Sequence, residues 1–490
     1  MSSEKAYVNP HVVRAEYAVR GLIPARADEI KKEIAEGKGA HPFTSLVYCN
    51  IGNPQSLDQK PLTFNRQVMA LFDAPFLLED EALVARFPAD AVARAKEYVD
   101  RVGNVTGAYT DSFGYDFARE AVAACINERD HHVQPEATME EICMTDGASG
   151  GITMAMELVL GGLEDAVMIP IPQYPFYTAQ IALLGAKTAP YYLHEADRWA
   201  MQADDLAAAY NKCMEEKKAT PRLLVCINPG NPTGGVLDRK VMEDVVRFCY
   251  DYNVLLLADE VYQENIYAAD RKFVSFREVV LSMPAPYSTG TMLVSLHSTS
   301  KGMIGECGRR GGFLNYTNLP AFSREMLSKL ASLALCANVN GQVMTALMST
   351  PPQKGDASYE SYWAEYNGIF SSLKERAALL ARELNTIRGM SCQLVDGAMY
   401  AFPQITLPAR YAEYNEAQNK KEGRKLALDA RWSLELLEAT GIVVVPGSGF
   451  GQEPNTLHFR TTILPPTAQM ERMVTAIRDL QNRIYANYGD

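Results

Sequence analysis

One loop of the sequence carries a lysine and two adjacent arginines among small residues. It spans residues 295–312 and reads SLHSTSKGMIGECGRRGG, with Lys301 near its centre and Arg309 and Arg310 near its end. Small residues let a backbone pass close to a ligand, a lysine amine can serve as a nucleophile, and an arginine fork suits a phosphate. These groups together favour a cofactor that is both an aldehyde and a phosphate ester, as pyridoxal 5′-phosphate is. A surface lysine on a glycine-rich turn is the alternative that this loop alone leaves open.

Short apolar runs alternate with helical patterns on both sides of that loop. The runs lie at residues 141–144, 166–169, 223–227, 254–258 and 292–296. Buried parallel strands read as short apolar runs, and the helices between them form the crossover connections. The pattern therefore predicts an α/β fold, in which a parallel or mostly parallel sheet is covered by helices on both faces.

Residues that could take part in binding or catalysis follow these runs. They are Ala148, Ser149, Tyr174, Asn231, Asp259 and Tyr262. Ligands of open α/β sheets bind beyond the carboxyl ends of the strands, so we expect these residues to meet in one crevice. Taken singly, each has an ordinary alternative, such as a helix cap, a core aromatic ring or a structural salt bridge.

Asp259 is the most informative of them because it follows a wholly apolar run, VLLLA. A carboxylate in that position is expected to be buried, and a buried charge needs a partner. The protonated ring nitrogen of pyridoxal phosphate would be such a partner. Ala148 and Ser149 open a helix whose free N–H groups form an anion site, while Tyr174 could stack on a planar ring and Tyr262 could donate to its phenolate oxygen. The residues therefore indicate a pyridoxal phosphate site.

The composition excludes several other classes of protein. The net charge of −12 argues against nucleic acid and anionic membrane surfaces as main partners, and no apolar run is long enough to span a bilayer. The nine cysteines are scattered without a CxxC pair and the histidines lack ligand spacing, so neither disulfides nor a metal site are expected. We expect a cytoplasmic protein, with a mitochondrial location as the alternative.

The length of 490 residues predicts more than one domain. We expect residues 1–90 to form an amino-terminal arm and part of a small domain, 91–345 a large cofactor-binding domain, and 346–490 the small carboxy-terminal α+β domain. The polar stretch 411–423, which has few branched residues, is expected to be a mobile insertion.

Three strings of the sequence resemble the class I/II, fold-type I aminotransferases. They are NPGNPTGG, ADEVY and STSKGMIGECGRRGG, and the likeness covers nearly the whole chain. The loops HPFTSLVYCNIGNPQ, TDGAS and IPIPQYPFY look specifically like the alanine aminotransferase branch. This resemblance implies a pyridoxal phosphate-dependent homodimer that acts on amino acids and 2-oxo acids. It also implies the ping-pong conversion of L-alanine and 2-oxoglutarate to pyruvate and L-glutamate.

The resemblance assigns roles around the cofactor ring. Lys301 would hold the cofactor as an aldimine and act as the catalytic base. Asp259 would pair with the ring nitrogen, and Asn231 and Tyr262 would bond the ring hydroxyl oxygen. Tyr174 would stack on the ring.

It also assigns the phosphate and substrate contacts. Ala148, Ser149, Ser298 and an arginine would hold the phosphate; the spacing favours Arg310, with Arg309 as the second choice. Tyr109 resembles the tyrosine that reaches the neighbouring subunit's cofactor. Three residues would contact the substrate: Arg460, in LHFRTTIL, at its α-carboxylate, together with Gly52 and Asn231.

Three other functions stay open at this point. The first is a lyase or a cyclopropane-forming synthase of the same fold, and the second is an aminotransferase of aromatic or kynurenine specificity. The third, a regulator or scaffold without activity, is disfavoured because Lys301, Asp259 and Arg460 are all present. Net amino-group transfer to a 2-oxo acid would separate an aminotransferase from the lyase and the synthase.

Overall fold

The computed structural model describes residues 8–15 and 21–489. Its centre is a seven-stranded sheet with the order β2-β8-β7-β6-β5-β3-β4. The strands are β2 (Ile142–Asp146), β3 (Asp165–Ile171), β4 (Lys187–Tyr192), β5 (Thr220–Ile227), β6 (Leu255–Asp259), β7 (Leu293–Ser298) and β8 (Gly311–Thr317). Only β8 runs against the others, since it pairs antiparallel with both β7 and β2. The sheet is therefore mostly parallel, as the sequence predicts.

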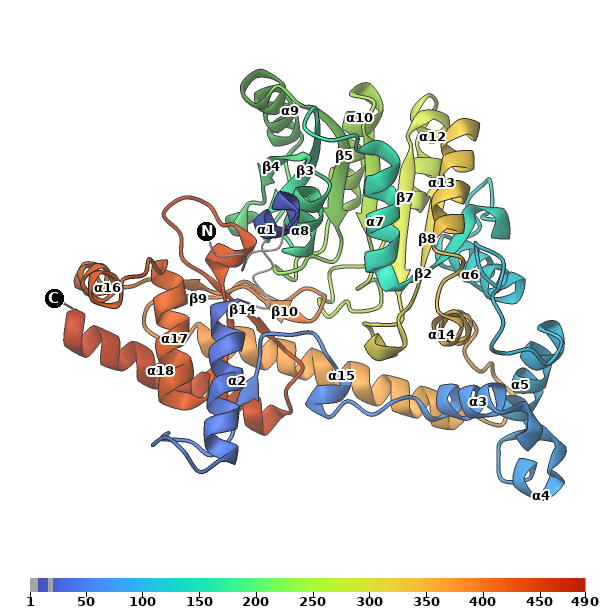
Figure 1. The fold of residues 1–490 in the computed structure, drawn as a ribbon, viewed down its shortest axis with the longest axis horizontal. Coiled ribbons are helices and arrows are strands. Elements are labelled where there is room, and N and C mark those ends of the chain that lie inside the picture. The colour runs from blue at the N-terminus through green and yellow to red at the C-terminus, as the bar shows by residue number, and fades with distance from the viewer. Residues whose placement is uncertain (1–7, 16–20, 490) are drawn as a thin grey trace, which may run out of the picture.

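Helices cover both faces of this sheet (Figure 1). One face carries α7 (Gly147–Val159), α8 (Phe176–Leu183) and α13 (Ala321–Leu333), and the other carries α9 (Ala203–Lys212), α10 (Arg239–Asp251) and α11 (Phe276–Ser282). Strand β6 shows why both faces need cover. Leu255 and Leu257 pack under the first group of helices, and Leu256 and Ala258 pack under the second, because successive side chains of a strand point to opposite faces.

A second group of helices lies beside strands β2 and β8. It consists of α3 (Thr63–Asp73), α4 (Glu81–Val84), α5 (Ala89–Arg101), α6 (Asp116–Arg129) and α14 (Val339–Ser349). Helices α3, α5, α6 and α14 share one apolar cluster with those two strands. The 26-residue helix α15 (Tyr359–Leu384) extends from this group toward the carboxy-terminal part of the molecule (Figure 1).

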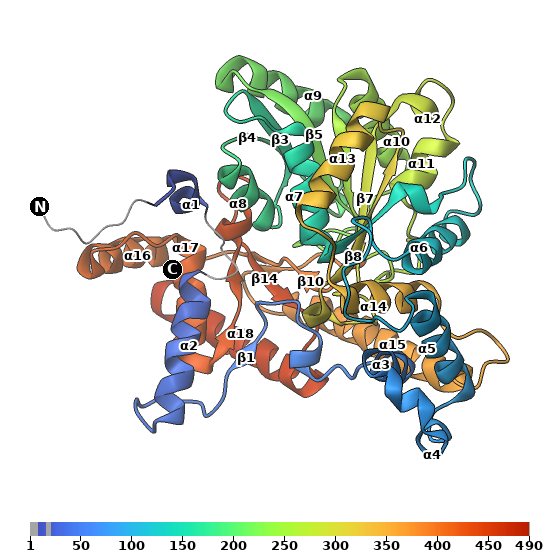
Figure 2. The same ribbon diagram turned by 45° about the vertical axis from the view of Figure 1, so that its right-hand side comes forward.

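The carboxy-terminal part forms its own core. Helices α16 (Ala409–Glu422), α17 (Leu428–Thr440) and α18 (Thr467–Tyr488) surround the short strands β9 (Met390–Ser391), β10 (Tyr400–Ala401), β11 (Gln404–Ile405), β12 (Ile442–Val443), β13 (Val445–Pro446) and β14 (Phe459–Thr462). Figure 2 shows this part set apart from the large sheet. Strand β14 pairs antiparallel with β10 and β13, so these three strands form a small antiparallel sheet.

The amino-terminal segment joins both parts. Helix α1 (Pro10–Arg14) lies on α8, where His11 bonds the carbonyl of Ala182. Helix α2 (Leu22–Ala35) packs on α17, and β1 (Val47–Tyr48) pairs in parallel with β12. The proposed division into domains at residues 90 and 345 stays a prediction.

The expectation of a mobile insertion at residues 411–423 is wrong, because this stretch forms helix α16. Although most of its residues are polar, Tyr411 and Asn415 are buried against the rest of the protein. Asn415 and Asn419 donate to the carbonyl of Leu426, and Glu422 accepts two bonds of 2.9 Å from Arg431. A helix with low hydrophobicity is thus ordered by polar contacts with the segment that follows it.

The described residues contain no helix that is long and apolar enough to cross a membrane. They also contain no group of three potential metal ligands. All nine cysteines are free thiols.

Candidate active site

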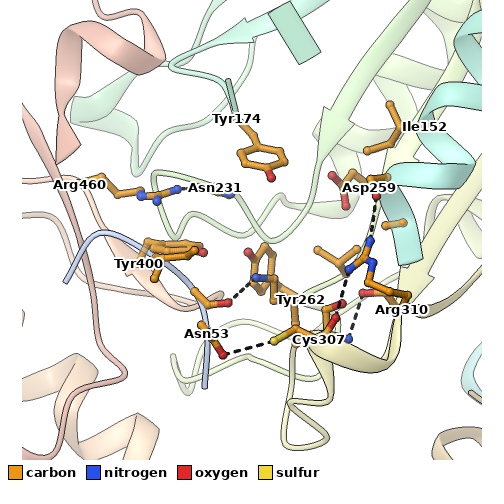
Figure 3. Close-up of a pocket in the computed structure, with 18 residues that line it drawn as sticks. Asn53, Ile152, Tyr174, Asn231, Asp259, Tyr262, Cys307, Arg310, Tyr400 and Arg460 are labelled. Carbon is orange, nitrogen blue, oxygen red and sulfur yellow. Dashed lines mark hydrogen bonds between the residues drawn. The ribbon is translucent and has the colours of Figure 1, made fainter. Parts of the chain in front are cut away.

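A cavity of about 360 Å³ opens at the carboxyl ends of the central strands. The large sheet, the segment around Gly52 and the carboxy-terminal part all contribute to its wall (Figure 3). The predicted site residues that line it are Gly52, Ala148, Ser149, Tyr174, Asn231, Asp259, Tyr262, Ser298, Lys301, Arg310 and Arg460. The fold therefore gathers residues that lie up to about 400 positions apart in the chain.

Two of the residues considered from the sequence lie outside this cavity. Tyr109 is 79% exposed and does not line it within one chain. Arg309 points away and pairs with the buried carboxylate of Glu306 at 3.3 Å. Between the two adjacent arginines, the geometry therefore favours Arg310 as the phosphate ligand.

Lys301 follows β7 and reaches into the cavity. Its Nζ donates a hydrogen bond of 2.8 Å to the carbonyl of Gly52 and lies 5.9 Å from the centre of the Tyr262 ring. Only a glycine fits at position 52, since a Cβ there would lie 2.1 Å from the hydroxyl of Tyr400 and 2.9 Å from Nζ of Lys301. The amino-terminal segment thus passes directly over the amine.

Asp259 ends strand β6 and is 5% exposed. Its Oδ2 accepts a hydrogen bond of 2.8 Å from the hydroxyl of Tyr177. Its Oδ1 is buried without a hydrogen-bond partner among the described residues. Burial raises the pKa of the carboxyl group despite the bond from Tyr177, because removal from water disfavours the charged form. A protonated ring nitrogen would satisfy this oxygen and restore the charge, so the site fits the pyridine ring of pyridoxal phosphate.

The opposite wall fits an anion. Strand β2 ends at Asp146 and helix α7 begins at Gly147, so the first N–H groups of the helix, with Ala148 and Ser149, face the cavity. Arg310 donates to the carbonyl of Asp146 at 2.9 Å and to the Ser149 hydroxyl at 3.0 Å. A Cβ at Gly147 would lie 2.6 Å from the Arg310 guanidinium, so this glycine lets helix and arginine approach one another. A phosphate group fits this corner.

Arg460 lies on strand β14 and is 1% exposed. It donates to the side chain of Asn231 at 3.0 Å and to the carbonyl of Asn50. Its guanidinium carbon lies 4.2 Å from the centre of the Tyr400 ring and 4.7 Å from that of Phe450. No carboxylate among the described residues forms an ion pair with it, and its buried Nε has no partner there. A buried cation without a counter-ion fits the carboxylate of a substrate.

Aromatic rings line the space between these two ends. Figure 3 shows Tyr174 on one side, Tyr262 and Tyr400 on the other, and Asn231 beside Arg460. Burial raises the pKa of Tyr262 well above its usual value, and the neighbouring hydroxyl of Tyr400 adds to the effect. Tyr262 is therefore a protonated hydrogen-bond donor at neutral pH.

Two residues of this site are absent from the sequence-based predictions. Tyr177, which holds Asp259, lies in the first turn of α8, and nothing in the sequence marks it as a partner of that aspartate. Tyr400 lines the cavity from the short strand β10. Nothing in its sequence context distinguishes it from a core tyrosine.

A doubly covered, mostly parallel sheet with a lysine, a buried aspartate and an anion-binding helix end at its carboxyl edge defines a fold-type I transferase. The family model for aminotransferase class I and II matches residues 83–477, and the chain belongs to this family, whose members depend on pyridoxal phosphate in general. The predicted fold class and family are thereby confirmed.

Individual relatives cover the whole chain. "Alanine aminotransferase 2" of Panicum miliaceum is 46% identical over 485 residues, which are 99% of this chain and 98% of that protein. "Glutamate–glyoxylate aminotransferase 2" of Arabidopsis thaliana is 42% identical over 483 residues, 99% and 96% of the two chains. The crystallised alanine aminotransferase of Pyrococcus furiosus shares the fold with a TM-score of 0.74 at 22% identity, over 97% of this chain and all of the other.

Proposed function

We propose that this protein is a pyridoxal phosphate-dependent aminotransferase that interconverts L-alanine and 2-oxoglutarate with pyruvate and L-glutamate. The observation that carries the proposal is the buried Oδ1 of Asp259, which has no hydrogen-bond partner among the described residues and belongs to a side chain that lines the same cavity as Lys301. It belongs to a chain that is 46% identical to an alanine aminotransferase. The substrates are amino acids and 2-oxo acids.

Pyridoxal phosphate, when bound, supplies an aldehyde that takes up an amino group and a ring that accepts the electron pair of the broken Cα–H bond. Asp259 would hold the proton on the ring nitrogen, and Tyr262 and Asn231 would bond the ring oxygen. Tyr174 would stack on the ring. Tyr177 keeps Asp259 in place through its hydroxyl.

The start of α7 would hold the phosphate. The backbone N–H of Ala148 and the hydroxyls of Ser149 and Ser298 would contribute hydrogen bonds, and Arg310 would supply the opposite charge. Arg309 keeps its structural partner Glu306 and takes no part.

Lys301 and Arg460 act on the substrate. Arg460 binds the α-carboxylate, with Asn231 fixing the guanidinium, and so directs the Cα–H bond toward Lys301. The neutral amine of Lys301 would take the Cα proton as a base and would then deliver a proton as an acid. The amino donor leaves as a 2-oxo acid before the second oxo acid binds, which gives ping-pong kinetics.

Glyoxylate is the second candidate for the amino acceptor. The observation that favours it is the 42% identity to a glutamate–glyoxylate aminotransferase over the same length. Alanine and pyruvate differ from glycine and glyoxylate by one methyl group, which is worth only about 1–3 kcal/mol of discrimination in an apolar pocket. The ratio of kcat/KM for pyruvate and glyoxylate with L-glutamate as donor would separate the two functions.

We propose further that the enzyme is a homodimer in which Tyr109 serves the neighbouring subunit's site. The support is the exposure of Tyr109, 79%, on a chain whose own cavity it does not line. Mixing inactive Lys301→Ala chains with Tyr109→Phe chains tests this. Mixed dimers would contain one complete site and regain activity, whereas a Tyr109 that serves its own chain would give no gain. The expected cytoplasmic location stays a prediction that cell fractionation would test.

The visible spectrum of the holoprotein tests the proposed function. We expect a yellow absorption band that bleaches with L-alanine and returns with 2-oxoglutarate, one half-reaction after the other. A band that ignores alanine but responds to another amino acid would reject the substrate. Absence of any band after addition of the cofactor would reject the site itself.

A further inference from the structure

Tyr400 touches both of the groups that would act on the substrate. It is 3% exposed and lines the same cavity as Lys301 and Arg460, and Figure 3 shows it beside Arg460. We propose that Tyr400 is a positioning residue of the active site, whose ring supports the Arg460 guanidinium and whose hydroxyl holds the Lys301 amine whenever that amine is free. The inference rests on the proposed function, which assigns tasks to Lys301 and Arg460 but none to Tyr400.

The ring of Tyr400 forms one side of a clamp on Arg460. The guanidinium carbon lies 4.2 Å from the centre of this ring and 4.7 Å from that of Phe450. A guanidinium over an aromatic face gains cation–π attraction while its N–H edge stays open to a ligand. The two rings thus fix the guanidinium, and the bond to Asn231 fixes its rotation.

The hydroxyl of Tyr400 shares a small space with the amine of Lys301. An ideal Cβ on Gly52 would lie 2.1 Å from the hydroxyl oxygen and 2.9 Å from Nζ. Both atoms therefore crowd the same side of Gly52, whose carbonyl accepts a hydrogen bond of 2.8 Å from that Nζ. The flexible lysine side chain is held at a defined place by these neighbours.

The charges around this hydroxyl support the arrangement. Burial raises the pKa of Tyr400, but the positive charges of Lys301 and Arg460 and the hydrogen bonds of Tyr262 and Lys301 bring it below its ordinary value. These three residues are the titratable or charged groups that act on it, and Asp259 acts on Tyr262 in turn. The Tyr400 oxygen is therefore a strong acceptor for the ammonium group.

This contact also keeps Lys301 away from Asp259. The two side chains line one cavity, yet no ion pair joins them among the described residues, and Oδ1 of Asp259 has no hydrogen-bond partner there. An amine that donates to the carbonyl of Gly52 and lies beside the Tyr400 hydroxyl leaves that oxygen for the cofactor. Tyr400 thus helps to keep the Lys301 amine apart from the Asp259 carboxylate.

A tyrosinate titration of the full-length chain, freed of cofactor, tests the contact without any turnover. We expect near-ultraviolet difference absorbance to detect a tyrosine that ionises below the ordinary value of about 10 in the wild type. That ionisation should vanish in Tyr400→Phe and move upward in Lys301→Met, which lacks the nearby charge. Tyr411→Phe, which removes a buried hydroxyl outside the cavity, should leave it unchanged. A Tyr400→Phe curve that matches the wild type would overturn the inference.

Kinetics separate the hydroxyl from the ring. Tyr400→Phe keeps the ring, so we expect kcat to fall by about tenfold, the effect of one lost hydrogen bond, with little change in the KM for L-alanine. Tyr400→Leu also removes support from Arg460, so KM should rise by about tenfold as well. Equal kinetic effects of the two variants would show that Tyr400 acts only as a filler of space.

A double substitution tests the shared space. In the wild-type background Gly52→Ala should reduce kcat/KM strongly, because its Cβ meets the Tyr400 hydroxyl. In the Tyr400→Phe background the same change should cost at least threefold less, since the clashing oxygen is gone. Additive losses would contradict the arrangement. A protein that passes the spectral test with alanine but fails these tests keeps its proposed function and loses only the role of Tyr400.

Discussion

The two halves of the cavity are built in different ways. Asp259, Asn231 and Ser149 follow strands of one sheet, and backbone pairing sets their places; Asp259, for example, is in register with Ile227 and Leu296. The other half comes from segments that are remote in the sequence. There Gly52 meets Lys301 across 249 positions, and Arg460 meets Asn50 across 410.

Because the two halves are built differently, we expect one to hold the cofactor and the other to bind the substrate. A sheet edge keeps its geometry without a ligand, so the first half is suited to hold a cofactor that stays bound. Contacts between remote segments can open and close with less cost, since few backbone hydrogen bonds change. The second half is therefore suited to bind and release substrates. Substitutions in the first half should impair binding of the cofactor, and those in the second half should impair binding of the substrate.

The largest effect is expected for Lys301→Ala, because both halves meet at this amine. Turnover should fall at least about a thousandfold, the scale of general acid–base catalysis, while the circular dichroism spectrum stays unchanged. The assay is the coupled formation of pyruvate from L-alanine. Lys329→Ala, which removes an exposed lysine on α13, serves as control. Normal turnover by the Lys301 variant would reject the proposed mechanism.

Asp259→Asn should have the next largest effect on turnover. It should also change the melting temperature in opposite directions in the holoprotein and in the cofactor-free protein. Loss of one side of a buried ion pair costs ~3–5 kcal/mol, so turnover should fall about 10²–10⁴-fold and the holoprotein should melt at a lower temperature. Without cofactor, the buried carboxylate forms no ion pair within the described part of the chain, so the same change should raise the melting temperature. A lower melting temperature in both forms would contradict a fit between Asp259 and the cofactor ring.

The sequence predicts the sheet half of the site well for a physical reason. A buried parallel strand is visible as an apolar run, and the residue after it must lie at the carboxyl edge. Asp259 could therefore be placed from VLLLA alone. The reversed direction of β8 was not visible, because an antiparallel strand buried on both faces carries the same apolar pattern as a parallel one.

The residues of the other half, which remote segments contribute, could be predicted only from family resemblance or not at all. Arg460 and Gly52 were named from their similarity to a family, whereas Tyr400 was missed, since its importance comes from contacts with residues far away in the chain. The prediction of a mobile insertion at residues 411–423, where the structure has helix α16, is wrong for a related reason. The stability of this helix depends on Arg431 and Leu426 in the following segment, and its own polar composition gives no sign of them.

Arg460→Gln tests the substrate half directly. The loss of charge-assisted hydrogen bonds to a carboxylate should raise the KM for L-alanine by about 10–100-fold, while the yellow band of the holoprotein stays intact. Spectral titration with L-alanine measures this effect. If the band itself were lost, Arg460 would belong to the cofactor half, and the division between the halves would fail.

Arg310→Gln and Arg309→Gln form a matched pair within the cofactor half. Arg310 bonds Ser149 at the anion corner, and Arg309 pairs with Glu306. We expect Arg310→Gln to weaken binding of pyridoxal phosphate by about tenfold, the cost of one charged contact, and Arg309→Gln to change it less than threefold. Titration of the cofactor-free chain by fluorescence quenching gives both constants. The reverse order would make Arg309 the phosphate ligand.

The smallest effect on turnover is expected for Glu260, the neighbour of Asp259. Its side chain accepts the backbone N–H of Phe276 at 2.8 Å and lies 3.9 Å from Arg129, outside the cavity. Burial raises the pKa of its carboxyl to about 7. The folded chain thus keeps a proton that an unfolded glutamate loses near pH 4.3, and the free energy of unfolding should fall as pH rises through this window.

Glu260→Gln removes this titration while keeping a similar shape. Its stability should depend less on pH, and above pH 7 it should exceed the wild type by an amount on the order of 3 kcal/mol. Turnover should stay within about twofold, because the side chain lies outside the cavity. Urea unfolding of the cofactor-free chain between pH 5 and 8 measures the slope, with Glu325→Gln as an exposed control. Parallel slopes for wild type and variant would mean that Glu260 stays charged in the fold. Two neighbouring buried carboxylates would then be held by counter-ions of different kinds, Arg129 for Glu260 and the cofactor for Asp259.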